Sequence, residues 1–287
     1  MLAYRHAFHA GNHADVLKHL VLVAVLRHMN QKEKGYRVVD THAGAGGYSL
    51  DSPYAHRKRE FEDGIGRLWK RADLPPLVAD YVDQVRQFNG GPELRQYPGS
   101  PALTRQLMRQ QDEARLYELH PTDHRILTSF VEGDPGVQVA MTDGFDSLKS
   151  CLPPPTRRGV LLIDPSYELK SDYAKVLAAL REGLARFATG THVVWMPQLQ
   201  LLEAAQLPAR LKASAVSAAP KGWLCARLTV ARADERGFGM LGSSLFVTNP
   251  PHTLADQLRQ ALPWLAAALA QDGVEPSWAV ETGGEHG

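Results

Sequence analysis

The tetrapeptide Asp164-Pro165-Ser166-Tyr167 carries the most specific chemistry in this chain, and it directly follows an apolar segment, 159–163, that predicts a buried strand. The aspartate can accept a hydrogen bond from an exocyclic amine. The proline turn aims a backbone carbonyl at the same amine, and the tyrosine offers a face for stacking. This arrangement suits methylation of the adenine amino group, because the N6 lone pair is delocalised into the ring and must be drawn out before it attacks a methyl group. Alone, the four residues equally fit a strand-to-loop turn whose acid caps the next helix.

Three other features that suit a bound nucleoside also follow predicted strands. A glycine-rich turn, 44–47, comes after a strand that ends at Asp40, and it lets a ligand approach the backbone closely. Glu118 could accept hydrogen bonds from both ribose hydroxyls, and Asp143 from an adenine amino group. Each acid also fits a simpler role, Glu118 facing solvent and Asp143 capping a helix. Because parallel strands end at one edge of a sheet, we expect these features to lie beside Asp164 and to fit S-adenosylmethionine.

Alternating strand and helix patterns predict an α/β fold, a parallel sheet with helices on both faces. Residues 52–99 interrupt the alternation with helical segments, which we interpret as a helical insertion. Ser100 suits an N-cap and Pro101 the first position of the next helix. The remaining predicted elements are a helix at 13–29, strands at 36–40, 115–119, 137–141, 160–163 and 191–196, adjacent and possibly antiparallel strands at 223–231 and 243–248, a helix at 253–270, and a loose tail after 273.

Composition limits the classes of protein that this chain can represent. Its 287 residues, 44% of them hydrophobic, can form one large α/β core. No run approaches the roughly 18 apolar residues of a membrane span. The formal net charge of +1 excludes a polycation, so contact with nucleic acid would need local patches such as 56–59, 70–71 and 157–158, which also fit a solvated surface. Cys151 and Cys225 form no disulfide framework, and we expect a cytoplasmic protein.

The chain resembles the RlmJ family of bacterial methyltransferases, which place a methyl group on N6 of one adenine in 23S ribosomal RNA. The most specific match is YRHAFHAGNHADVLKH at residues 4–19. Other matches follow in order along nearly the whole chain: DTHAGAG at 40–46, YPGSP at 97–101, ELHP at 118–121, RRG at 157–159, RFATG at 186–190 and NPP at 249–251. The resemblance implies a Rossmann-like class I methyltransferase with S-adenosylmethionine as methyl donor, formed as a single domain over 1–287 with a small helical insertion at 52–99.

The resemblance also implies roles for individual residues. The expected catalytic residues are Asp164, Pro165 and Tyr167, and the expected contacts to the RNA substrate are Tyr4, Arg5 and His6. Residues 1–30 are expected to pack over the donor site. We expect a monomer that binds ribosomal RNA and no membrane. With the glycine turn and the lysine beside His19 included, the expected donor-binding residues are Lys18, His19, His42, Gly44, Ser100, Glu118, Asp143, Gly144 and Asp164.

Four histidines crowd the first twenty residues, which raises the alternative of a metal site: His6, His9, His13 and His19. No cysteine and few acids lie beside them, whereas metal sites combine such ligands. We therefore expect no metal. Contacts to the donor or to RNA for one or two of these histidines, with structural roles for the others, fit better.

Two rival functions stay open, and one departure from the family pattern gives slight support to the second. The family motif is Asp-Pro-Pro-Tyr, and this chain has Ser166 in place of the second proline. Serine frees φ and restores a backbone N–H, so the turn could be looser, yet the acid and the aromatic remain and we expect activity. The first rival is a DNA adenine methyltransferase using the same motif. The second is a non-catalytic RNA-binding assembly factor that kept a donor pocket.

Overall fold

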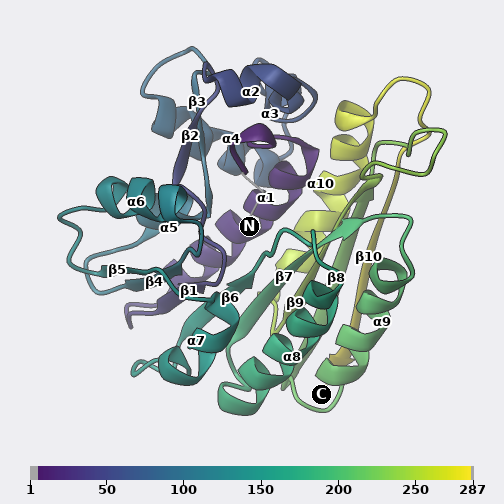
Figure 1. The fold of residues 1–287 in the computed structure, drawn as a ribbon. Coiled ribbons are helices and arrows are strands. Elements are labelled where there is room, and N and C mark those ends of the chain that lie inside the picture. The colour runs from purple at the N-terminus through teal and green to yellow at the C-terminus, as the bar shows by residue number, and fades with distance from the viewer. Residues whose placement is uncertain (1–5, 286–287) are drawn as a thin grey trace.

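A single eight-stranded sheet organises the protein, and the computed structural model describes residues 6–285 of it. The strand order is β10-β8-β9-β7-β6-β1-β4-β5 (Figure 1). Neighbours from β5 to β7 are parallel, and β9, β8 and β10 add antiparallel pairs. The strands are β1 (Arg37–Asp40), β4 (Glu113–Tyr117), β5 (Val137–Ala140), β6 (Gly159–Ile163), β7 (Thr191–Gln198), β8 (Lys221–Thr229), β9 (Gly242–Thr248) and β10 (Ser277–Glu285).

Helices cover both faces of this sheet. One face packs against α1 (His13–Asn30), α5 (Ser100–Leu107) and α10 (Leu254–Leu269), and the other against α7 (Gly144–Cys151), α8 (Ser171–Arg186) and α9 (Leu202–Ala215), while α6 (Pro121–Phe130) packs beside β5. Neighbouring residues of β1 alternate between the two layers: Val38 belongs to the core under α1, and Val39 to the core under α8. The predicted Rossmann-like α/β fold is therefore confirmed.

Residues 52–99 hold the short elements that interrupt the sheet. These are α2 (Pro53–Lys58), η2 (Glu60–Asp63), α3 (Ile65–Trp69), α4 (Pro76–Asn89) and β3 (Gln96–Pro98), and β3 pairs with β2 (Gly47–Ser49) in a separate two-stranded sheet. Tyr81 of α4 and Tyr97 of β3 are fully buried, and they join the same core as α1. Figure 1 shows these elements at one end of the molecule, above the main sheet.

The helix α1 is buried on nearly all sides, because it lies between the sheet and the helices α4, α5 and α10. Its start is fixed by Asn12, whose side-chain oxygen accepts hydrogen bonds from the backbone N–H groups of Ala14 and Asp15, both at 3.0 Å. Residues three and four apart share a helix face, so this start sets the direction of Asp15, Lys18 and His19 together.

Three sequence expectations about elements are wrong. The segment after 273 is not a loose tail, because β10 pairs with β8 along its length and forms the edge of the sheet. The helix α9 was not expected at all. Ser100 is the first residue of α5 rather than its N-cap, which is Gly99, because the serine hydroxyl donates instead to Asp40. No helix in the described part of the chain has the length and apolar character needed to cross a membrane.

Candidate active site

A cavity of about 700 Å³ opens at the carboxyl ends of β1, β4, β6 and β7. Most of its wall comes from η1 (His6–Phe8) with the first turns of α1, the loops after the parallel strands, the start of α5, and the loop between β8 and β9. Residues of the insertion also line it, together with Tyr48 and Gln271. This is the edge at which ligands bind in open α/β sheets. The acids predicted to meet at one edge therefore do so, with Glu118, Asp143 and Asp164 all in its lining.

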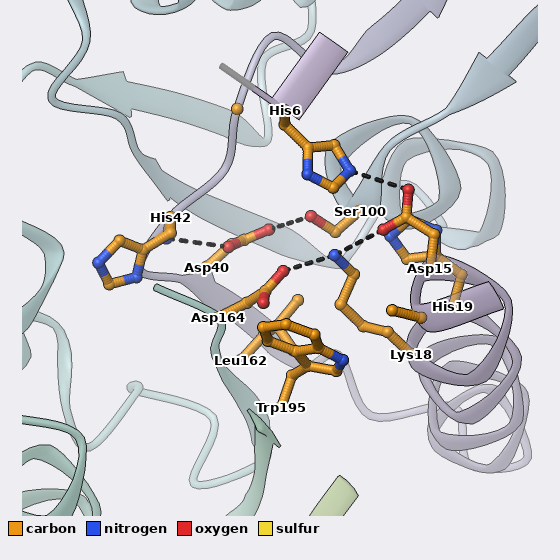
Figure 2. Close-up of polar contacts among 12 residues, drawn as sticks. His6, Asp15, Lys18, His19, Asp40, His42, Ser100, Leu162, Asp164 and Trp195 are labelled. Atoms are coloured by element: carbon orange, nitrogen blue, oxygen red, sulfur yellow. Dashed lines mark hydrogen bonds and ion pairs between the residues drawn. The ribbon is translucent and has the colours of Figure 1, made fainter. Parts of the chain in front are cut away.

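An ion-pair network joins the end of β6 to α1 (Figure 2). The ammonium of Lys18 lies 2.5 Å from Asp164 Oδ2 and 2.9 Å from Asp15 Oδ1. Asp15 is held in turn by His6 Nε2 at 2.8 Å and by the backbone N–H of Gly11 at 2.9 Å. Lys18 thus fixes the position of Asp164, an interaction that the sequence did not predict, since Lys18 was expected to contact the donor.

The charges in this network are strongly coupled. Burial by itself would lower the pKa of Lys18, but the carboxylates of Asp15 and Asp164 outweigh it and raise that pKa above its usual value. Burial would raise the pKa of Asp15, but His6 and Lys18 hold it well below its usual range. Lys18 is therefore an ammonium and Asp15 a carboxylate at neutral pH, in a site that is largely closed to water.

Asp40, at the end of β1, forms a second buried polar cluster beside the first. Its carboxylate accepts hydrogen bonds from the Ser100 hydroxyl at 2.6 Å and from the His42 backbone N–H at 3.2 Å. Burial raises the pKa of Asp40 to about 6, against the lowering effect of the Ser100 hydrogen bond, and the nearby charge of Asp164 adds to the rise. Ser100 and His42 are thereby positioned at the cavity wall through Asp40.

The raised pKa of Asp40 predicts a pH-dependent stability. Between its usual pKa of 3.8 and about 6 the folded protein binds more protons than the unfolded chain, so stability falls as pH rises through this window. In Asp40→Asn the charge is absent and the Ser100 hydroxyl can rotate to accept from the new amide. We expect this variant to gain up to about 3 kcal/mol in unfolding free energy at pH 7.5, with no gain near pH 4. Urea denaturation without donor, at both pH values, measures this; an equal difference at both would contradict it.

The donor half of the cavity is built from the loops after β1, β4 and β5. The Glu118 carboxylate accepts hydrogen bonds from the backbone N–H groups of Gly44 at 2.8 Å and His120 at 2.6 Å, and burial raises its pKa. Gly44 has φ +65°, and a side chain there would collide with the Tyr48 hydroxyl. Asp143 caps α7 by accepting from the Phe145 N–H at 2.9 Å. Asp143 therefore has the simpler role that the sequence allowed, that of a helix cap. The second carboxylate oxygen of Asp143 lies 3.6 Å from the Lys175 ammonium.

Two buried histidines in the cavity lining are neutral. Burial lowers the pKa of His42 to about 4 and that of His19 to about 3. His19 Nδ1 lies 2.7 Å from the Tyr97 hydroxyl, while its Nε2 is buried and has no hydrogen-bond partner within residues 6–285. Because an unpaired buried N–H is costly, this nitrogen is suited to a ligand carboxylate. Together with Glu118 at the other end, it fits the amino-acid and ribose groups of S-adenosylmethionine.

Tyr167 is not placed as the sequence suggested. Its ring is only 5% exposed, lies outside the cavity lining and packs between Tyr173 and Trp195. Its hydroxyl donates to the Trp195 carbonyl at 2.6 Å, and its backbone has φ +55°. A left-handed turn after Pro165 therefore directs the ring inward, and the tyrosine anchors the Asp164 loop to β7. The large ring that does line the cavity beside Lys18 is Trp195, which the sequence analysis missed.

Ser166 lies in the cavity lining between Pro165 and the buried Tyr167. Its hydroxyl accepts a long hydrogen bond, 3.5 Å, from the Glu168 backbone N–H, so the turn keeps a local bond of its own. In Ser166→Pro, we expect kcat/KM to agree with the wild type within about fivefold, about 1 kcal/mol in barrier, because the anchors of the turn are Tyr167 and Lys18. Matched steady-state kinetics of the two proteins test this. A large gain in the proline variant would show that serine impairs the turn.

The expected RNA contacts are only partly described. His6 lines the cavity beside Tyr48 and reaches Asp15, whereas Tyr4 and Arg5 lie outside the described residues. The histidines near the start of the chain do not converge: His9 pairs with Glu60 at 2.8 Å, and His19 with Tyr97. Within residues 6–285 no three side chains of histidine, cysteine, aspartate or glutamate are grouped as a metal site requires.

The structure thus brings all nine residues predicted to bind the donor into the lining of one cavity. In the cavity lining are Lys18, His19, His42, Gly44, Ser100, Glu118, Asp143, Gly144, Asp164 and Pro165. Such a cavity at the carboxyl edge of a Rossmann-like sheet, lined by Glu118 and Asp143, fits a class I methyltransferase that uses S-adenosylmethionine. Comparison with known proteins narrows the class. The family model described as ribosomal RNA large subunit methyltransferase D, RlmJ, matches residues 33–280, and this chain belongs to that family.

Relatives cover almost the full chain. The ribosomal RNA large subunit methyltransferase J of Haemophilus influenzae is 45% identical over 98% of both chains, and that of Escherichia coli is 43% identical over 95% of this chain and 96% of its own. The crystal structure of a Legionella pneumophila protein, 32% identical, superposes with a TM-score of 0.84 over 96% of this chain and 98% of its own. The resemblance in the sequence motifs is therefore confirmed.

Proposed function

We propose that this protein transfers a methyl group from S-adenosylmethionine to N6 of one adenine in 23S ribosomal RNA. One observation carries the proposal: the Asp164 carboxylate is held at the cavity by Lys18, in the same cavity whose other end presents Glu118 and Asp143. The family and the names of its relatives supply the RNA substrate. Ribosomal RNA also supports a cytoplasmic site of action, and we infer a monomer.

The chemistry divides among a few side chains. Bound S-adenosylmethionine supplies an electrophilic methyl group. Asp164 and the carbonyl of Pro165 accept the two N6 hydrogens of the target adenine, which raises electron density on the nitrogen. The nitrogen attacks the methyl group as the carbon–sulfur bond breaks, and one N6 proton then leaves through Asp164 to water. Lys18 orients Asp164 through the contact between its ammonium and Oδ2, and orientation supplies much of the rate. We assign the stacking face to Trp195, and to Tyr167 the role of holding the turn.

The donor contacts follow from the two ends of the cavity. We assign the ribose hydroxyls to Glu118, the donor adenine to Asp143 and Gly144, and the amino-acid group to His19, with Ser100, His42 and Gly44 shaping the wall. Lys18 and Asp164 lie on either side of the position at which the methyl group is transferred. Every one of these residues except Lys18 and His19 follows or begins an element at the carboxyl edge of the sheet.

The remaining parts of the chain are assigned to the RNA. A target base must leave its stack to reach a buried acid. We propose that residues 1–30 pack over the donor site, that Tyr4, Arg5 and His6 contact the RNA, and that the helical insertion at 52–99 belongs to one methyltransferase domain over 1–287. His6 and Lys58 both line the cavity, which supports contact from these two parts of the chain.

The test is transfer of labelled methyl from S-adenosylmethionine to unmodified 23S ribosomal RNA, compared with double-stranded DNA. Label on N6 of a single RNA adenine supports the proposal. Label on DNA but not on RNA would favour the rival DNA adenine methyltransferase. Donor binding without label on either would favour a non-catalytic RNA-binding assembly factor.

A further inference from the structure

The loop between β8 and β9, residues 230–241, forms the wall of the cavity farthest from the donor half. Ala231, Arg232, Gly239 and Met240 of this loop lie in the cavity lining together with Trp195 of β7. Pairing of β8 and β9 with each other and with β7 brings their loop to the cavity edge of the sheet. None of the assignments above uses this loop.

Hydrogen bonds give the loop a fixed shape. One oxygen of the Asp234 carboxylate accepts the backbone N–H groups of Arg236 at 2.9 Å and Phe238 at 2.8 Å, and the Asp234 N–H donates to the Phe238 carbonyl at 2.7 Å. The backbone N–H of Leu241 donates to the Gln198 carbonyl at 2.9 Å, which ties the loop to β7. Phe238 lies between Gly237 and Gly239, both with positive φ, and its backbone N–H and carbonyl are both hydrogen-bonded to Asp234.

What this shaped loop presents is an apolar ring and an arginine. The Phe238 side chain is 69% exposed, and it lines a hollow that adjoins the main cavity. Arg232 lines the cavity, is exposed, and has no ion pair or side-chain hydrogen bond within the described residues. The same two side chains line this adjoining hollow of about 500 Å³, which shares Asp63, Arg232 and Gln271 with the main cavity.

Two of the three acids that line the hollow are engaged by groups other than Arg232. Asp63 is paired with Arg67 at 2.6 Å, and Asp234 is occupied by the loop backbone. Arg67 also donates to the Ala270 carbonyl, which fixes the opposite wall. Among residues 6–285, Asp272 is the one acid in this lining whose side chain has neither an ion pair nor a hydrogen bond. The hollow therefore holds an arginine without an ion pair in the described residues, Arg232, in the same lining as an exposed ring, Phe238.

We propose that this loop holds the nucleotide next to the target adenine, with Phe238 stacked on its base and Arg232 on its phosphate. The proposal rests on the proposed function. When the target base leaves its stack, its neighbour loses a stacking face, and an exposed aromatic ring replaces that face with any base. An arginine contacts the phosphate without reading sequence. The loop is thus a holding site for the RNA strand beside the reacting base, distinct from the donor contacts.

The experiment compares Phe238→Leu, Phe238→Tyr and Arg232→Gln with the wild type on 23S ribosomal RNA. We expect Phe238→Leu to raise KM for the RNA about tenfold with little change in kcat, and Phe238→Tyr to stay near the wild type, because stacking is kept. Arg232→Gln should raise KM and lower the salt slope of RNA binding by about one. The dissociation constant for S-adenosylmethionine should stay unchanged in all three. Arg210→Gln and Val216→Ala, on and after α9 and outside the cavity lining, serve as matched controls.

A second readout separates stacking from a general loss of fit. RNA carrying 2-aminopurine beside the target adenine reports stacking through fluorescence quenching, which the wild type and Phe238→Tyr should show and Phe238→Leu should lose. If the wild type methylates the RNA but the loop variants match the controls in KM and quenching, the loop has no such role and the proposed function stands. If the wild type transfers no label to RNA, the proposed function fails, and the loop proposal fails with it.

Discussion

Replacement of Asp164 by alanine is expected to lower kcat at least about a thousandfold, the range seen when a group that stabilises a developing charge or accepts a proton is removed. The carboxylate is the acid at the end of β6 that faces the cavity and is held there by Lys18. Without it, only the neutral carbonyl of Pro165 is left to accept an N6 hydrogen, and no charged group draws electron density onto the nitrogen. The fold should survive, because Lys18 keeps Asp15 as a partner at 2.9 Å. Donor affinity should fall far less than kcat, because the other residues assigned to the donor are unchanged. Single-turnover methyl transfer and calorimetric titration with S-adenosylmethionine measure the two properties.

Asp164→Asn is the matched control for this prediction. The amide oxygen can still accept one N6 hydrogen, but it carries no charge and cannot hold a proton, so we expect an intermediate rate. If Asp164→Ala kept the turnover of the wild type, Asp164 would not be the carboxylate that accepts the N6 hydrogen in catalysis. If it lost donor binding in parallel with turnover, its role would be to bind the donor.

Replacement of Lys18 by methionine is expected to be damaging in two ways at once. Two carboxylates, Asp15 and Asp164, would share a largely buried site without their ammonium, and breaking such a pair costs about 3–5 kcal/mol of unfolding free energy. Turnover should fall as well, because Asp164 loses the contact that orients it. Urea denaturation and kcat, measured on the same preparation, quantify the two losses.

A double variant separates the two effects of Lys18. Adding Asp15→Asn to Lys18→Met removes one of the uncompensated charges, so it should recover part of the stability while turnover stays low. Equal stability of the single and double variants would show that the buried charge does not cause the loss. Full turnover in Lys18→Met would show that Asp164 needs no partner from α1.

The strand ends were predictable because local signals agreed there. Apolar runs marked β1, β4, β5 and β6, and each ended at an acid or a glycine turn, so the common edge followed from parallel pairing alone. The direction of Tyr167 was not predictable from the motif, because it depends on a positive φ and on a carbonyl of β7. The sequence did not identify Trp195 as a site residue for a related reason. A tryptophan within an apolar strand is expected in the core, and only the order of strands in the sheet brings it beside Lys18.

The missed elements lacked a clear local pattern. In α9, Pro208 stands inside the helix and the buried side is limited to Leu207, Leu211 and Ala215, so the helical periodicity is weak. In β10, glycines near the end suggested a flexible tail, whereas the strand is held by its ladder with β8, a contact between segments about fifty residues apart. Pairing over such distances in the chain is not encoded in a local window. The Lys18–Asp164 contact escaped prediction for the same reason.

The ion pairs around Lys18 also bear on how the reaction finishes. Two carboxylates and one ammonium leave this trio with one negative charge, which the sulfonium of the incoming donor offsets. Once the methyl group has moved, the sulfur of the by-product is neutral and the negative charge is again uncompensated. Methyl transfer thus removes the attraction between this negative charge and the sulfonium. We therefore expect S-adenosylhomocysteine to bind more weakly than S-adenosylmethionine. The ratio of the dissociation constants for S-adenosylmethionine and S-adenosylhomocysteine measures this, and a protein that held the by-product more tightly would be releasing it by other means.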